Sequence, residues 1–124
     1  MRLSSKETKD SDGPDIRMEW SDIRTLIAKW EIPHSMKMDI EEQFSIPFQE
    51  LPFVLRLYDV TDREIRGDGM DHYVDFLINQ EAPQWVLYGV KEDRDYCVEL
   101  GVRMIDGRFY SLIRSETVFS QIAS

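Results

Sequence analysis

The sequence predicts a mainly β fold, an antiparallel two-sheet sandwich of immunoglobulin-like or fibronectin-like architecture with about six strands and one short helix near residues 35–44. Several segments of strand length alternate apolar and polar residues and are separated by turn residues. One segment alone has helical spacing, and strands do not alternate regularly with helices, which disfavours a doubly wound sheet. A small open barrel is the alternative arrangement of the same strands.

The length of 124 residues fits one domain with a single core. Residues 1–17 are polar and charged, so they cannot bury enough apolar surface to offset their ordering entropy. We therefore expect a flexible acidic and polar tail at 1–17, a single β-sandwich domain at 18–119, and a short C-terminal tail at 120–124.

The first predicted strand covers residues 25–32, where Leu26, Ala28 and Trp30 share one face, and it ends at Pro33. The predicted helix follows within residues 34–44. Its apolar stripe consists of residues spaced four apart, namely Met36, Ile40 and Phe44. Ser35 is a candidate N-cap, and Asp39 offers a shorter alternative start.

The remaining predicted strands lie at 52–60, 72–79, 84–90 and within 96–118. The last segment is a hairpin with Asp106-Gly107 at its turn, a strong signal for a two-residue type I′ turn. That turn would set five further pairs besides the outward ion pair Glu99–Arg114: Val98–Ser115, Leu100–Ile113, Gly101–Leu112, Val102–Ser111 and Arg103–Tyr110. It would also place Phe109 opposite Met104, with Val98, Leu100 and Val102, on the core face.

Five segments together resemble a bacterial family known only as a domain of unknown function, number 4912: WEIP (30–33), LRLYDVTD (55–62), YCVELGV (96–102), DGRFYSLIRS (106–115) and the following ETV (116–118). The resemblance covers residues 20–118. It departs from the family pattern where this chain has Ser21-Asp22-Ile23 before the first strand and Ile113 before Arg-Ser. It implies a β-rich fold with one helix and a bacterial source, and it implies no activity.

Aromatic residues offer one candidate binding surface. Trp85, Tyr88 and Tyr110 could form a stacking platform for a carbohydrate, because exposed rings stack on sugar faces. The alternative is that Trp30 and Trp85 belong to the core, since both are in phase with aliphatic neighbours. We expect the core position for both tryptophans.

A polar set is the second candidate. Glu99, Arg114 and Arg56, with Asp59 near them, could anchor a partner segment, because arginine is favoured at interfaces. The simpler interpretation is a cross-strand ion pair that holds the hairpin in register. The opposed pair explains both Glu99 and Arg114 without a partner, so the simpler interpretation is favoured.

Charge and composition disfavour several function classes. The net charge of −9 disfavours binding to nucleic acid or to an anionic membrane surface. Cys97 is the single cysteine and the N-terminus has no apolar signal segment, so we expect a cytoplasmic protein without disulfides. The acidic loop after Asp59 has interleaved arginines and lacks calcium-ligand spacing, so a solvated loop is the better interpretation.

No catalytic set, metal site or cofactor site is expected from these residues. The leading hypothesis is a non-catalytic interaction module that binds another protein or itself through a sheet face or an open edge strand. Carbohydrate-type ligand binding is the alternative, and an enzyme of unknown class ranks third.

Overall fold

The structure, a computed structural model, describes residues 13–61, 72–79, 81–82 and 84–121. The predicted tail up to residue 12, the acidic loop from residue 62 to residue 71 and residues 122–124 lie outside the described part.

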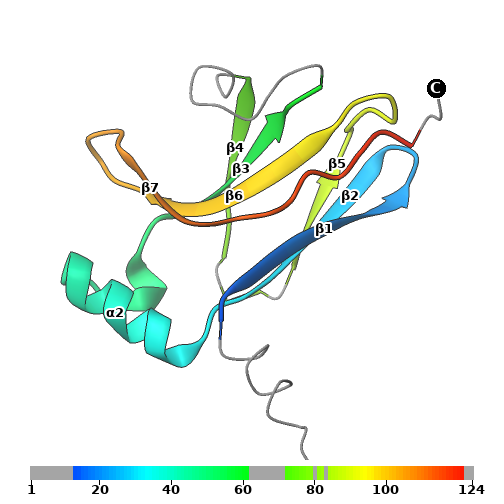
Figure 1. The fold of residues 1–124 in the computed structure, drawn as a ribbon. Helices are drawn as coiled ribbons and strands as arrows, with labels where there is room; N and C mark the ends of the chain where they lie inside the picture. Colours follow the sequence, from blue (N-terminus) through cyan, green and yellow to red (C-terminus); the bar gives the residue numbers. More distant parts are fainter. Residues whose placement is uncertain (1–12, 62–71, 80, 83, 122–124) are drawn as a thin grey trace, which may run out of the picture.

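Two antiparallel sheets pack face to face (Figure 1). The three-stranded sheet has the order β1-β2-β5 and contains β1 (Asp15–Asp22), β2 (Thr25–Glu31) and β5 (Gln84–Tyr88). The four-stranded sheet has the order β4-β3-β6-β7 and contains β3 (Phe53–Asp59), β4 (Tyr73–Leu77), β6 (Tyr96–Arg103) and β7 (Phe109–Arg114). The predicted two-sheet sandwich is confirmed, and the described residues form seven strands rather than about six.

The extra strand is β1, which sequence reasoning missed. It begins at Asp15, so residues 15–17, predicted to lie in the tail, belong to the first sheet. Ile16 and Met18 are buried at alternate positions, and their charged neighbours are exposed. The period-two alternation was present in the sequence, but the surrounding charges concealed it.

The helix α2 (His34–Phe44) and the short 3₁₀ helix η1 (Phe48–Glu50) connect the two sheets at one end of the sandwich (Figure 1). The predicted stripe is confirmed, because Ile40 is buried and both Met36 and Phe44 pack against the core. The predicted N-cap at Ser35 is wrong, as is the shorter start at Asp39. Pro33 is the N-cap residue, since its extended backbone leaves its carbonyl free to accept the Lys37 N–H at 3.0 Å.

The core lies between the sheets and is aliphatic at its centre. Leu26, Leu55, Leu87 and Leu100 are fully buried, as is Phe53 near η1. Val98 and Val102 on β6 are also fully buried, and Trp30 is 8% exposed. The expected core positions of β6 and of Trp30 are therefore confirmed.

The β6–β7 turn differs from the predicted type I′ turn. Gly107 donates its N–H to the Met104 carbonyl at 2.8 Å, and Met104 donates back to the Arg108 carbonyl at 2.8 Å. Gly107 has φ +92°, whereas Asp106 is not among the described residues with positive φ. These features identify a three-residue loop, a type I turn followed by a glycine bulge. The Asp-Gly sequence suits this loop as well, because the bulge position that Gly107 occupies also needs a positive φ.

The longer loop shifts the strand register near the turn by one residue. Arg103 pairs with Phe109, and Val102 pairs with Tyr110, so these two aromatic residues exchange the faces predicted for them. The predicted pairs Gly101–Leu112 and Val102–Ser111 are wrong for the same reason. A bulge between Leu100 and Gly101 then restores the predicted register, and the pairs Leu100–Ile113 and Glu99–Arg114 are confirmed.

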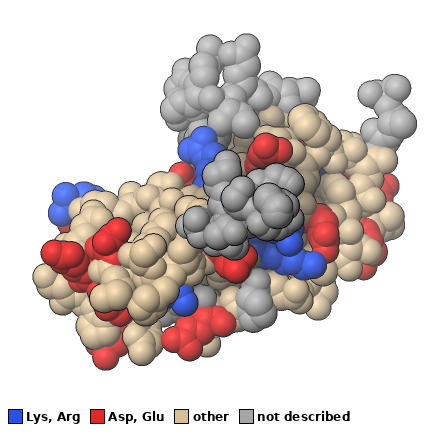
Figure 2. All heavy atoms as spheres, turned by 60° about the horizontal axis from the view of Figure 1, so that its bottom comes forward, with Lys and Arg blue, Asp and Glu red and all other residues tan. Residues whose placement is uncertain are grey.

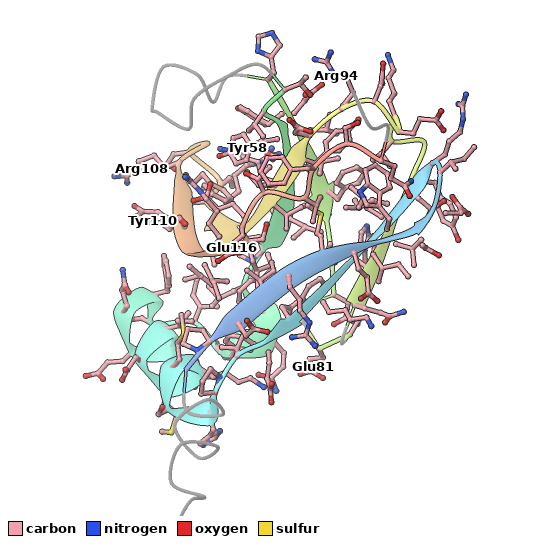
Figure 3. The ribbon with its side chains drawn as sticks, turned by 45° about the vertical axis from the view of Figure 1, so that its right-hand side comes forward. Tyr58, Glu81, Arg94, Arg108, Tyr110 and Glu116 are labelled. Atoms are coloured by element: carbon pink, nitrogen blue, oxygen red, sulfur yellow. The ribbon has the colours of Figure 1, made fainter. Side chains whose placement is uncertain are left out.

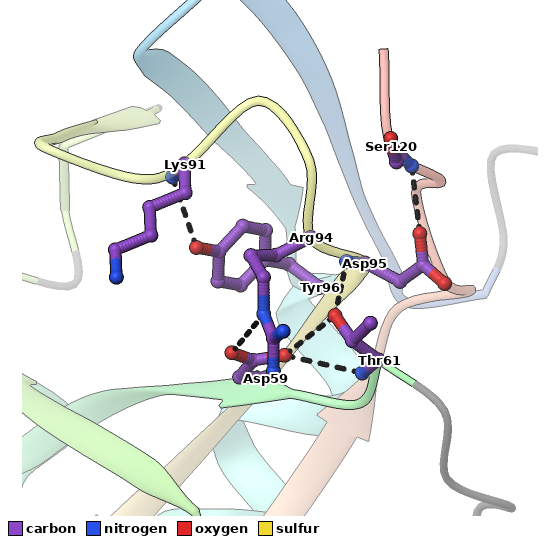
Figure 4. A network of polar contacts seen from close by, with 7 residues as sticks. All are labelled: Asp59, Thr61, Lys91, Arg94, Asp95, Tyr96 and Ser120. Carbon is purple, nitrogen blue, oxygen red and sulfur yellow. Dashed lines mark hydrogen bonds and ion pairs between the residues drawn. The ribbon is translucent and has the colours of Figure 1, made fainter. Parts of the chain in front are cut away.

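Tyr96 fixes the start of β6 (Figure 4). Its hydroxyl accepts the backbone N–H of Lys91 at 3.0 Å, the arrangement called a tyrosine corner in immunoglobulin-like sandwiches. Burial raises the pKa of this hydroxyl above its ordinary value. Tyr96 also exchanges backbone hydrogen bonds with Val118, which holds the segment after β7 against β6.

A polar network closes the same end of the sandwich (Figure 4). Asp59 accepts hydrogen bonds from the Thr61 hydroxyl at 2.8 Å and from Arg94 at 2.9 Å. The Thr61 hydroxyl accepts the Asp95 N–H at 2.7 Å, and the Asp95 carboxylate accepts the Ser120 N–H at 2.7 Å. Ser120, predicted to begin the C-terminal tail, is therefore hydrogen-bonded to the folded domain.

Candidate functional site

A row of charged side chains crosses all four strands on the outer face of the four-stranded sheet, and it contains three members of the predicted polar set. In the strand register, Arg56 on β3 lies directly opposite Asp75 on β4 and Glu99 on β6. Glu99 in turn lies opposite Arg114 on β7. Positive and negative side chains thus alternate along the row. The structure brings Arg56, Glu99 and Arg114 together as predicted, whereas Asp59 lies apart from them in the network with Arg94.

Glu99 is the most buried member of the row. Its side chain is 8% exposed, and its Oε1 accepts the Tyr58 hydroxyl at 2.7 Å. Arg114 Nη2 lies 3.5 Å from the other carboxylate oxygen. Burial, followed by the hydrogen bond to Glu99, raises the pKa of Tyr58 to about 12. Tyr58 rather than Arg114 is therefore the closer partner of Glu99. Sequence reasoning missed Tyr58, although its position two residues after Arg56 predicts the same face.

The Arg56 side chain is held more firmly than an arginine in an exposed ion pair would be. Its Nε and Nη2 donate to the two oxygens of Asp75 at 2.7 and 3.0 Å. Its guanidinium also lies between the Tyr73 and Phe109 rings, 4.0 Å from each ring centre. The Asp75 hydrogen bonds are the main reason that the Arg56 pKa rises above its ordinary value. A bidentate pair combined with stacking on two rings fixes the guanidinium plane.

The Asp75 carboxylate accepts hydrogen bonds from two arginines. Arg103 donates to the oxygen Oδ2 at 2.9 Å, beside the contacts from Arg56. Burial would raise the Asp75 pKa, but the hydrogen bonds and charges of Arg56 and then Arg103 outweigh burial and lower it. The sequence predicted neither Asp75 nor Arg103 as a site residue, since the pairing of β3 with β4 across the intervening loop could not be inferred.

Gly101 makes room for the ring that covers Arg56. A Cβ at this position would lie 2.6 Å from the Phe109 ring and 2.4 Å from the Tyr110 carbonyl oxygen. Phe109 therefore occupies the space above Gly101 on the outer face. A glycine is needed here for close approach, not for an unusual backbone angle.

The predicted aromatic platform does not form, because its three rings lie in different surroundings. Trp85 pairs with Ala28 and packs against the core, whereas Tyr88 alternates to the other face of β5 and is 79% exposed. Tyr110 packs edge-on against Phe44 of α2, with ring centres 5.3 Å apart. Figure 3 shows Tyr110 beside Arg108 at the hairpin, on the side of α2.

Cys97 lies on the outer side of β6 and is fully buried beside Tyr58 and Val60. Burial raises the pKa of its thiol to about 11, so the nucleophilic thiolate is disfavoured. Within the described residues, no group of three or more His, Cys, Asp or Glu side chains is arranged to hold a metal ion. The described part of the chain also has no helix with the length and apolarity needed to cross a bilayer.

A second feature is a groove between β1 and β7, which we call the edge groove. It has a volume of about 640 Å³ and is lined by residues 14–18 on one side and by residues 113–114 and 116–118 on the other. β1 and β7 are edge strands of different sheets. Ile16 and Met18 form an apolar floor, and Arg17, Arg114 and other charged side chains form the rim.

The two sides of the edge groove run in the same direction (Figure 1). Beyond the groove, Trp20 Nε1 donates to the Phe119 carbonyl at 3.0 Å, and the Gln121 side chain donates to the Asp22 carbonyl at 3.1 Å. From the first of these bonds to the second, the chain advances by two residues on β1 and by two residues in the segment after β7, so the two segments are parallel. These bonds also close one end of the groove.

Charge is spread unevenly over the molecular surface. On the face shown in Figure 2, acidic side chains gather over α2, and Lys and Arg side chains lie separately between acidic ones. Asp39 and Glu42 are exposed on that helix. The described residues of the outer face of the four-stranded sheet include three arginines, Arg56, Arg103 and Arg114, beside the carboxylates of Asp75 and Glu99.

Solved structures with a similar fold are fibronectin-type and related β-sandwich domains. The FN5 domain of Drosophila Lar is 12% identical with a TM-score of 0.51, covering 90% of this chain and 97% of that one. The FN3 domain of human collagen XX is 13% identical with a TM-score of 0.51, covering 86% and 88%. A computer-based redesign of a β-sandwich protein is 9% identical with a TM-score of 0.52, covering 89% and 91%. At these identities the likeness extends to the fold alone.

No curated protein matches this chain. The family described as "Domain of unknown function (DUF4912)" matches residues 16–123, nearly the whole described fold. The match begins at the second residue of β1 and includes the row on the outer face and the lining of the edge groove from residue 16 onward. The resemblance inferred from five sequence segments is therefore confirmed, and this chain belongs to the DUF4912 family.

Proposed function

We propose that this domain is a non-catalytic protein-binding module that accepts an extended segment of a partner polypeptide in the edge groove. The observation that carries the proposal is the parallel course of two edge strands, from different sheets, on either side of one groove. The volume of about 640 Å³ lies within the range of roughly 300–1,000 Å³ found for small-molecule pockets, which is room for a few side chains of an extended segment.

Edge strands favour this mode of binding because every second residue directs its backbone N–H and C=O away from its own sheet. β1 and the segment after β7 run in the same direction, so one extended segment antiparallel to both could pair with either edge. Addition of a strand to a sheet edge is a recurrent mode of peptide recognition.

The lining indicates the composition of the partner. Ile16 and Met18 offer an apolar floor, and the rim combines Asp15 and Glu116 with Arg17 and Arg114. The rim charges balance, so we expect a segment that alternates apolar with polar residues and has little net charge.

Two observations support a non-catalytic role. The Cys97 thiol is buried with a raised pKa, and the Glu99 carboxylate is occupied by Tyr58 and Arg114. The reactive side chains of the outer face are thus engaged in contacts within the domain. The fold likeness to fibronectin-type domains is compatible with this role.

The test begins with a display library of random 12-residue peptides, panned against the full chain. We expect selected peptides to slow amide hydrogen exchange at residues 15–18 and 113–118. Thr117→Trp, which places a ring in the groove, should abolish binding of these peptides. Ser35→Trp on the exposed side of α2 is the matched control and should retain it.

Peptides that protect a different surface, or that bind Thr117→Trp as well as the wild type, would contradict the proposal. Failure to select any peptide, together with a monomer by light scattering, would contradict it as well. A dimer that Thr117→Trp converts to a monomer would identify a second copy of this chain as the partner.

A further inference from the structure

A pocket of about 410 Å³ lies on the outer face of the four-stranded sheet, near the β6–β7 turn. Two guanidinium groups, from Arg56 and Arg103, contribute to its lining. Tyr73, Leu77 and Ile105 line it as well, and the last two are 72% and 105% exposed. We call it the guanidinium pocket. It shares no residue with the edge groove.

The charges in the guanidinium pocket do not balance. Both arginines donate to the one carboxylate of Asp75, which accepts three hydrogen bonds from described residues. Among the described residues of the pocket and its partner Asp75, two cations and one anion leave one positive charge in excess. An anionic ligand would neutralise it, and the partly enclosed site would strengthen that attraction relative to open water.

The two arginines have different roles. Arg56 is 13% exposed and is fixed between two rings, so its geometry is already set before a ligand arrives. Arg103 is 46% exposed, and within the described part of the chain its guanidinium donates one hydrogen bond, to Asp75. Its other N–H groups can therefore reach a ligand.

We propose that the guanidinium pocket binds a carboxylate side chain of a partner polypeptide, with an apolar residue next to it. The carboxylate contacts Arg103, and the apolar neighbour packs on Leu77 and Ile105. Exposed apolar side chains beside a guanidinium match this combination.

The charges also select among anions. One excess positive charge is matched by a carboxylate, whereas a phosphate monoester carries about −1.5 to −2 charges near neutral pH. The net charge of −9 repels strongly acidic ligands over longer distances. A single Asp or Glu within an apolar context is therefore favoured over a polyacidic segment.

The probe is N-acetyl-glutamyl-leucinamide, titrated into the ¹⁵N-labelled full chain and followed by backbone and arginine Nε resonances. We expect the largest shifts at Arg103, Arg56 and Tyr73. N-acetyl-glutaminyl-leucinamide has the same shape without the charge and should bind at least tenfold more weakly.

Arg103→Ala should weaken binding of the glutamyl probe at least tenfold. Arg108→Ala, which removes an exposed arginine paired with Asp106, should leave the affinity unchanged. Equal binding of both dipeptides, shifts away from the pocket, or tighter binding of inorganic phosphate would each overturn the proposal. Because the probe does not require the edge groove, failure here is distinguishable from failure of the proposed function.

Discussion

At the scale of single residues, Asp75 shows how a partly buried charge depends on its partners. The side chains of Asp75 and Arg56 are each 13% exposed, so neither is well hydrated. Their bidentate pair, with Arg103 as a third member, replaces the lost hydration. Removal of the Asp75 charge leaves the buried Arg56 uncompensated, and the loss exceeds that of an exposed pair.

Asp75→Asn should lower the free energy of unfolding at pH 7 by about 2–4 kcal/mol, because Arg56 loses its counter-charge while it stays buried. The folded-state pKa of Asp75 lies below its unfolded value, so the stabilisation is complete above the unfolded pKa of about 3.9 and is lost as pH falls through the folded pKa. The difference between wild type and variant, measured by urea unfolding, should therefore shrink as pH falls below about 4.

Asp15→Asn is the matched control, since Asp15 and its partner Arg17 are 50% and 68% exposed. It should change stability at pH 7 by about 1 kcal/mol or less. A difference between wild type and Asp75→Asn that stays constant down to about pH 2.5 would contradict the proposed pair.

At the scale of elements, the β6–β7 hairpin combines two irregularities that cancel. The three-residue loop shifts the register by one residue, and the bulge next to Gly101 shifts it back. Between them, Phe109 faces outward over Gly101, where it covers Arg56. The outer row and the guanidinium pocket therefore depend on backbone geometry within this hairpin.

Gly101→Ala should destabilise the domain by about 2–3 kcal/mol, because the new Cβ overlaps the Tyr110 carbonyl, a backbone atom that cannot rotate away. The urea midpoint should fall with an unchanged slope. Gly13→Ala is the control, since nothing lies within 4 Å of the place its new methyl group would occupy, and it should shift stability by less than about 0.5 kcal/mol. A Gly101→Ala variant as stable as the control would show that the hairpin is not closely packed here.

At the scale of the whole molecule, β6 is the central element. Residues Tyr96–Val102 are buried on both faces, by the core on one side and by the outer row on the other. Cys97 lies within this strand and is the single cysteine of the chain. Its exposure therefore requires the outer face to open.

We expect Cys97 to resist thiol reagents in the folded protein and to react with one equivalent in urea. Burial raises its pKa to about 11, whereas an unfolded thiol ionises near about 8.5, so stability should fall as pH rises between these values. Labelling with a chromogenic disulfide reagent measures the reactivity of the native and the urea-unfolded chain, with Cys97→Ala as the blank, and urea unfolding across this pH range measures the change in stability. Rapid labelling of the native chain at pH 8 would contradict the buried position.

The sequence predicted more of the fold than of the site. Six of the seven strands, the helix stripe and the buried column Val98–Leu100–Val102 follow from local periodicity. The strand β1 was missed because its apolar residues Ile16 and Met18 stand between charges. The hairpin turn was assigned to the wrong type because Asp-Gly serves two loop lengths, and local sequence does not distinguish them.

For the candidate site, local sequence identified Glu99 and Arg114, because opposed charges on a hairpin face are visible in the pairing, and it added Arg56 of β3 without a predicted strand partner. It could not identify Asp75 or Phe109. Asp75 reaches Arg56 through the pairing of β4 with β3, and Phe109 reaches it through the corrected register. Both depend on how strands from separate parts of the chain are placed together.

By itself, the sequence determined the class of fold, its core and its family, since periodicity, turn residues and segment order are local properties that the chain carries before it folds. Only the tertiary structure decided that two arginines share one carboxylate and that two edge strands flank a groove. Long-range strand pairing creates these neighbours, and burial then sets the strength of their interactions.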